Sequence, residues 1–320
     1  MKVMTCLITL PDNKAKVGAI HKPESITINT SFKEFAQTAV ITLPRNVEAY
    51  DRLNIREVFA HGSKIEIKVG YDGVVTHTFK GYITHVTADY PIVIKCQDEM
   101  FKLRKLPVNY SAKSVQLATM LQALAPGYTI DALEGVTLTN IRLKKTTLGA
   151  TLEKLKSDFG LYSYMEGETL VCGKYYSDNT NETAETVYLD KAIKSNDLEY
   201  RNGDDIVLKI KGTANTPTGQ KIEFETGEDG GDELSLIYPK ANSLAELKRL
   251  VLEDYITRKL GGYEGTLTAF LLPILKHGRK VVLESGLFPE RNGQYYVDAV
   301  NIFFTPTGAG QELKIGGQVK

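Results

Sequence analysis

The stretch His61-Gly62-Ser63-Lys64-Ile65-Glu66-Ile67-Lys68-Val69-Gly70 alternates apolar and polar residues and places Ile65, Ile67 and Val69 on one face. A period of two is typical of a strand with one buried face. A similar stretch, His277-Gly278-Arg279-Lys280-Val281-Val282-Leu283-Glu284-Ser285-Gly286, follows 216 positions later, and four of the ten residues are identical. The chain therefore carries one strand pattern in each of its halves.

The same offset places Phe79 on Tyr295, and each of these residues begins another extended segment. We expect a duplication, in which two copies of one β domain carry different insertions. The alternative is that strands bounded by glycine resemble one another by chance.

Further segments around the first stretch alternate in the same way and are bounded by turn residues. They are Met1–Leu10, Ser25–Thr30, Thr38–Leu43, Thr78–Val86 and Ile92–Cys96. Asp72-Gly73 is a residue pair favoured in tight hairpins. We expect residues 1–105 to form a first tube-like β-barrel domain, with a loop or one short helix between Asn46 and Ala60.

The period changes to that of a helix after Leu106. Apolar residues recur at helical spacing at Leu117, Leu121 and Leu124 until Pro126-Gly127, and a second helical stripe runs from Thr147 to Phe159 before Gly160. Ser111 and Ser114 are the candidate N-caps of the first helix. Short strands at 161–165 and 169–172 complete a small α+β domain, for which we expect the bounds 106–175.

The last part of the chain begins with a polar linker, Tyr176–Glu185, and returns to strand patterns. The segments are Asp205–Lys211, Lys221–Thr226, Val281–Leu283, Tyr295–Phe304 and Leu313–Ile315. Ser243 and Glu246 form a capping box for one long helix, which Gly261-Gly262 ends. We expect residues 176–320 to form a second tube-like β-barrel domain that includes this helix. The predicted fold class is mainly β, with two similar barrels bracketing an α+β domain.

Composition excludes several classes of protein. The 320 residues carry 39 basic and 39 acidic side chains, so no strong field attracts nucleic acid or an anionic membrane. No apolar run approaches the roughly 20 residues that a membrane span needs. The amino terminus predicts a first strand and no signal peptide. Cys6, Cys96 and Cys172 are odd in number and far apart, which predicts buried free thiols in a reducing cytoplasm.

No pattern in the chain predicts catalysis or a bound metal. The five histidines, His21, His61, His77, His85 and His277, lack zinc-site spacing, and surface or turn positions are the simpler interpretation. The acidic pairs Glu166/Glu168, Asp204/Asp205 and Asp232/Glu233 lie in turns, where solvating charges are expected. The glycine-rich acidic stretch 227–233 lacks the calcium-loop register. We therefore expect no catalytic, cofactor-binding or metal-binding residues and no cofactor. The seventeen tyrosines favour interfaces or half-buried strand faces.

Taken in order, these pieces resemble the hub protein of contractile phage tails, the late control protein D family, and the N-terminal hub module of VgrG spike proteins. The matching stretches are Ala39–Asn46, Gly62–Gly73, Phe79–Val86, Cys96–Lys105, Tyr263–Thr268 and Gly293–Val300. They are structural signatures that extend over nearly the whole chain, and none is an active-site fingerprint.

The resemblance implies a virion structural protein without enzymatic activity. Three chains would form a ring with pseudo-sixfold symmetry that joins the sixfold tail tube to the threefold spike. The implied partners are two further copies of the chain, the tail spike protein, and the tail tube or distal tail protein. The chain ends at Lys320 without a β-helix repeat, so we expect a separate spike polypeptide and a phage or prophage particle rather than a secretion system. The implied location is the tail baseplate, assembled in the host cytoplasm.

Two other classes of protein stay open from the sequence. One is a carbohydrate- or peptidoglycan-acting enzyme with β domains, which an acidic pair in a deep cleft would support. The other is an adhesion module, against which the missing signal peptide speaks.

Overall fold

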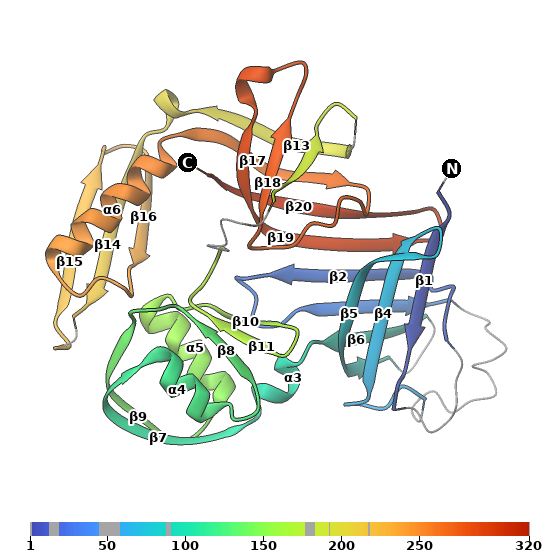
Figure 1. Ribbon diagram of the computed structural model, residues 1–320, viewed down its shortest axis with the longest axis horizontal. Coiled ribbons are helices and arrows are strands. Elements are labelled where there is room, and N and C mark those ends of the chain that lie inside the picture. The colour runs from blue at the N-terminus through green and yellow to red at the C-terminus, as the bar shows by residue number, and fades with distance from the viewer. Residues whose placement is uncertain are drawn as a thin grey trace.

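The computed structural model describes residues 2–12, 19–44, 58–87, 91–176, 183–191, 193–216 and 218–319. Strands dominate the chain, and helices gather in two small units beside the main sheet (Figure 1). The expected fold class is confirmed: two similar β units bracket an α+β unit. Most of the expected loop at Asn46–Ala60 and of the linker at Tyr176–Glu185 lies outside the described residues.

The first β unit is fully antiparallel. Its strands are β1 (Met4–Thr9), β2 (Ser25–Ser31), β3 (Thr38–Leu43), β4 (Lys64–Tyr71), β5 (Val74–Val86) and β6 (Ile92–Gln97), in the spatial order β1-β4-β5-β6-β3-β2. Ile65, Ile67 and Val69 are all buried, as their alternation predicts. Asp72 and Gly73 both have positive φ, the geometry of the tight turn that joins β4 to β5.

The second β unit repeats this arrangement. Its strands are β12 (Glu185–Tyr188), β13 (Ile193–Asn202), β17 (Gly261–Ala269), β18 (Lys280–Glu284), β19 (Gly293–Thr305) and β20 (Gly308–Gln318), in the order β12-β18-β19-β20-β17-β13. In both units the first strand is followed in space by the fourth, fifth, sixth, third and second strands. The units differ in direction at one place, since β1 is antiparallel to β4 whereas β12 is parallel to β18.

The agreement extends to single hydrogen bonds near the repeated sequence. In each unit the glycine that follows the histidine of the repeated stretch donates its N–H to the carbonyl of one residue in the fifth strand. That fifth-strand residue donates its own N–H to the carbonyl of the residue after the glycine. The donor–acceptor pairs are Gly62–Ile83 and Ile83–Ser63 in the first unit, and Gly278–Val297 and Val297–Arg279 in the second. A bulge follows at once in both, between Ile83 and His85 and between Val297 and Ala299. Two independent folds would not share such detail, which supports the duplication.

The two units share one sheet and one core. β2 pairs with the second part of β19, with Ile26–Ser31 opposite Ala299–Phe304, and this contact joins all twelve strands (Figure 1). One cluster of buried apolar side chains extends through both units. The Tyr71 hydroxyl crosses between them and donates to the carbonyl of Ala309 at 3.0 Å. The expected barrels are therefore parts of a single continuous structure.

The α+β unit lies between the two β units in the chain and has its own core. Its elements are α3 (Met100–Leu103), β7 (Pro107–Gln116), α4 (Leu117–Leu124), β8 (Thr129–Ala132), β9 (Thr137–Thr147), α5 (Leu148–Phe159), β10 (Ser163–Glu166) and β11 (Thr169–Cys172). Helix α5 has the expected ends: the Thr147 hydroxyl accepts from Ala150 N–H, and Gly160 is left-handed.

The predicted N-caps Ser111 and Ser114 are wrong. Both lie in β7, which pairs with β9, and α4 begins after Gln116 without a side-chain cap. Pairing with β9 supplies these residues with backbone partners that a local sequence window does not contain.

A third small unit is inserted between β13 and β17. Its sheet has the order β15-β14-β16, from β14 (Leu208–Asn215), β15 (Lys221–Gly227) and β16 (Asp232–Ile237), and α6 (Leu244–Arg258) covers one face (Figure 1). The predicted N-cap is confirmed, because Ser243 Oγ accepts from Glu246 N–H at 3.2 Å, while the Glu246 carboxylate reaches back to Asn242 N–H at 3.0 Å, one residue before the cap. The short η1 (Gly203–Asp205) precedes β14, so the strand expected from Asp205 begins at Leu208.

Candidate assembly interface

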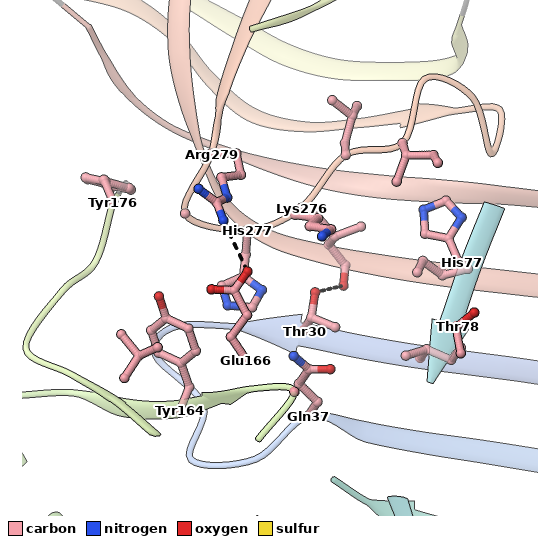
Figure 2. A pocket seen from close by; sticks show the side chains of 18 of the residues that line it. Thr30, Gln37, His77, Thr78, Tyr164, Glu166, Tyr176, Lys276, His277 and Arg279 are labelled. Atoms are coloured by element: carbon pink, nitrogen blue, oxygen red, sulfur yellow. Dashed lines mark hydrogen bonds and ion pairs between the residues drawn. The ribbon is translucent and has the colours of Figure 1, made fainter. Parts of the chain in front are cut away.

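A cavity of about 470 Å³ lies where the two β units meet the α+β unit (Figure 2). Strands β2, β5, β10 and β19 contribute to its wall, together with the segment that leads into β18. Two ion pairs balance charge there: Arg279 with Glu166 at 3.1 Å, and Lys174 with Asp131 at 2.5 Å. Each pair cancels formal charge, and Lys276 adds one positive charge to the lining of this polar junction.

Two histidines face this cavity from the two β units. His77 in β5 is 7% exposed, and the His277 ring packs edge-on against Tyr164 at 5.0 Å (Figure 2). Burial lowers the pKa of each imidazole to about 4, because the charged form loses its hydration. The expectation of surface or turn positions is wrong for His77, which is buried in β5, whereas His277 lies in the turn before β18 and is partly exposed, as that expectation allows. Contacts between units bury His77, and the spacing of histidines along the chain carries no sign of those contacts.

Aromatic side chains lie beside the cavity and hold the units together. The rings of Tyr176 and Tyr296 stack at 3.9 Å, and the Tyr176 hydroxyl donates to Asp298 Oδ1 at 2.7 Å. Lys33 Nζ binds the other oxygen of Asp298 at 2.9 Å. Asp298 thus ties the loop after β2, the segment after β11 and β19 to one carboxylate. These tyrosines lie at junctions within the chain, in keeping with the interface interpretation of the tyrosine-rich composition.

An acidic groove occurs at the contact between the first β unit and the α+β unit. Asp98 is 5% exposed, and burial raises its pKa to about 7. Its two oxygens accept the backbone N–H groups of Gln37 and Met100, at 3.0 and 3.1 Å. The neighbouring Glu99 accepts from the hydroxyls of Tyr82 and Tyr128, at 2.7 and 2.9 Å. These adjacent carboxyls are not among the acidic pairs named from the sequence; their signal there is an acidic pair directly after a buried strand.

The acidic pairs selected from the sequence are dispersed in the structure. Glu166 is bound to Arg279, and Asp232 lies 3.6 Å from Arg201. Asp229, in the acidic stretch 227–233, is bound to Lys209 at 2.7 Å. Within the part of the chain that the structure describes, no group of three or more histidine, cysteine, aspartate or glutamate side chains could hold a metal ion.

The cysteines are buried free thiols, as expected. Burial raises the pKa of Cys6 and of Cys96 to about 12, and that of Cys172 to about 11. Thiols in this state are protonated and poorly reactive at neutral pH. No helix among the described residues combines the length and apolarity needed to cross a membrane.

One edge of the twelve-stranded sheet, formed by β13, is largely exposed. Strand β13 pairs with β17, and among the described residues no strand pairs with its other side. It is ten residues long, and most of its side chains are exposed. The N–H of Leu198 is bound by the Asn196 side chain at 3.0 Å instead of by a strand. A long edge of this kind is a template for pairing with another chain.

Comparison with known proteins bears on the fold. No protein-family model and no curated protein sequence matches the chain. Solved structures do: a tail protein of Neisseria meningitidis is 13% identical with a TM-score of 0.66, over 99% of this chain and 97% of that one. The fold is that of phage tail proteins.

Two further structures agree with this assignment of the fold. A 43 kDa tail protein of a Shewanella oneidensis prophage is 11% identical with a TM-score of 0.63, over 98% of this chain and 97% of that one. An E. coli component of the type VI secretion system, described as similar to T4 phage tail proteins, is 9% identical with a TM-score of 0.55, over 93% of this chain and 74% of that one. Phage tails and type VI secretion thus both use the fold found here.

Proposed function

We propose that this chain is a structural baseplate hub protein of a phage tail or phage-like contractile particle. Three copies form a ring that joins the sixfold tail tube to the threefold spike. The observation that carries the proposal is the duplicated β unit, with one strand order in both halves of a chain that has the tail-protein fold. Three chains of this kind present six similar β units to a tube and three identical chains to a spike.

The proposal follows the resemblance to the late control protein D family. It assigns residues 1–105 and 176–320 to the two tube domains and 106–175 to the α+β domain between them. The partners are two further copies, the tail spike protein, and the tail tube or distal tail protein. The protein is assembled in the host cytoplasm and resides in the virion tail baseplate, and its role needs neither an enzymatic activity nor a cofactor.

Self-assembly is the first expected result. Mass in solution, measured over rising protein concentration, is expected to move from one chain towards three, with no species beyond three, because a closed ring leaves no free interface. If the free chain stays monomeric, the same measurement is made with the spike protein added, since hubs are assembled on partners. Open-ended growth, or a final stoichiometry other than three, would contradict the proposed ring.

Association is also expected to be faster at low salt. The segment 1–105 carries 15 basic and 11 acidic residues, whereas 176–320 carries 17 and 22. Opposite net charge on alternating units raises the rate of encounter more than the affinity. Rates measured between about 20 and 500 mM salt test this, because screening acts over about 8 Å at physiological ionic strength. A rate indifferent to salt removes the charge argument and leaves the ring untouched.

The acidic groove is the one feature that favours the enzyme alternative. A buried carboxyl with a raised pKa beside a second carboxyl is a common acid–base arrangement. Here the oxygens of Asp98 and Glu99 bind backbone N–H groups and tyrosine hydroxyls that join two units. We expect no release of soluble fragments from purified peptidoglycan. Release that Glu99→Gln abolishes, in a variant that unfolds at the wild-type temperature, would favour the enzyme.

A further inference from the structure

Strand β19 extends beyond the part that pairs with its neighbour β18 in the same unit. Its first part pairs with β18, with Lys280–Leu283 opposite Gly293–Tyr296. Its second part, Ala299–Phe304, pairs with β2 of the other β unit. The fifth strand of one unit therefore binds the second strand of the other, and this contact is the joint between the two units (Figure 1).

The duplicated units can be aligned residue by residue through their strand pairings. In each unit the second strand lies opposite the third, the third opposite the sixth, and the sixth opposite the fifth. The resulting series are Ile28, Ala39, Cys96 and Ile83 in the first unit, and Leu198, Gly265, Ile315 and Val297 in the second. Ile83 is aligned with Val297, so His85, two residues later, corresponds to Ala299. Ile28 is aligned with Leu198, so Ser31, three residues later, corresponds to Arg201.

The alignment identifies two strand edges that the single chain leaves without a partner strand. The second strand of the second unit is β13, the exposed edge described above. The fifth strand of the first unit is β5, which pairs with β4 as far as Tyr82 and with β6 from Tyr82 to Val86. Beyond Ile83, the His61 ring bonds to the carbonyl of Thr84 at 2.9 Å, and no described strand covers the β4 side of β5 at His85 and Val86.

We propose that β13 of one copy pairs with His85 and Val86, at the end of β5 of the next copy, antiparallel and in the register that begins the β2–β19 joint. Arg201 of one chain then lies opposite His85 of its neighbour, as Ser31 lies opposite Ala299 within the chain. The proposal rests on the proposed ring, which supplies the number of copies. It deepens the ring by naming the strands that close it.

Three observations select a second copy as the occupant of this edge. Every chain already contains one such joint, between β2 and β19. The two strands with an edge that no described strand covers, β13 and β5, are the equivalents of β2 and β19, so a second copy is needed to form the same pairing between them. The two strands belong to segments of opposite net charge, 176–320 and 1–105. The interface is heterologous, because one copy offers β13 and the other β5, and such contacts close into rings when the rotation permits.

Cysteine cross-linking tests the register. In the double variant His85→Cys, Arg201→Cys, both positions are exposed, and the native thiols are too buried to compete. Mild oxidation is expected to produce covalent species up to three chains on a denaturing gel, and each single variant is expected to produce no covalent ladder. The matched control is His85→Cys, Asp197→Cys. Residue 197 lies on the same face of β13 but roughly 13 Å along the strand from residue 201, and a disulfide needs Cα atoms within about 7 Å.

The outcomes of this experiment distinguish the strand pairing from the ring itself. Cross-linking of the Arg201 variant at least about tenfold above the Asp197 control, at equal protein concentration, supports the pairing. A three-chain mass with no cross-link, or with equal cross-linking in both variants, overturns the strand pairing and leaves the ring standing. A chain that stays monomeric at its highest soluble concentration, with or without the spike, and shows no cross-link, overturns both the ring and the pairing. Thermal unfolding at the wild-type temperature confirms that the variants are folded.

Discussion

Replacing Phe79 with alanine is expected to lower the free energy of unfolding by about 3–5 kcal/mol, the usual cost of removing a buried aromatic side chain. Phe79 is 2% exposed and lies opposite Ile67 in the β4–β5 hairpin, within the core that the two β units share. The cavity that remains cannot collapse easily, because both neighbouring strands are fixed by their ladders. Denaturant unfolding at neutral pH measures the difference.

The matched control is Phe288→Ala, which removes the same atoms from a side chain that is 45% exposed. Its ring lies under the Arg291 guanidinium at 4.3 Å, and losing such a surface contact costs about 0.5–1 kcal/mol. A cost at Phe79 no larger than that at Phe288 would show that the core is not shared as described. A proportionate loss at Tyr295, a fully buried aromatic residue of β19 in the second unit, would extend the result to both units.

Acid is expected to destabilise the protein through His77 and His277. Each pKa falls from 6.5 to about 4 on folding, so between these values the unfolded chain binds protons that the folded chain does not. Stability is therefore lost as the pH falls from about 6.5 towards 4. By pH 4.5 the loss is about 2–3 kcal/mol for each histidine.

Variants separate this effect from the other groups nearby. His277 also faces Glu166, Arg279 and Lys276, and Lys276 acts on His77 as well. Asp98 works in the opposite direction, because its raised pKa of about 7 means that its contribution is lost as the pH rises from about 4 to 7. The double variant His77→Gln, His277→Gln keeps the Asp98 contribution and removes that of the histidines.

Unfolding of wild type and double variant is compared at pH 7 and at pH 4.5. The variant is expected to lose less stability than the wild type between these conditions, by several kcal/mol in total. His85→Gln, at an exposed position, is the matched control and is expected to follow the wild type. An equal loss in the wild type and the double variant would show that the two imidazoles are accessible to protons in the folded state.

Local sequence predicted most individual elements of the fold. Strand β3 matches its predicted bounds, and the Asp72-Gly73 turn, the ends of α5 and the Ser243 cap form as expected. These features depend on residues within a few positions of one another, through alternation, capping hydrogen bonds and glycine or aspartate in turns. The absence of catalytic and metal-binding residues stays a prediction from motifs, and the peptidoglycan assay tests its catalytic half.

The repeated strand pattern at 61–70 and 277–286 was enough to predict that the chain contains two copies of one β unit. Tertiary structure decided how those copies meet: the β2–β19 joint, the burial of His77, the strand identity of the segment around Ser111, and the free edge of β13. The physical reason is that strands pair through backbone N–H and C=O groups, which nearly every residue carries alike. Alternation identifies which face of a strand is buried, but the backbone groups do not specify which strand they pair with. The pairing is therefore known only once the tertiary structure shows which distant segments lie side by side.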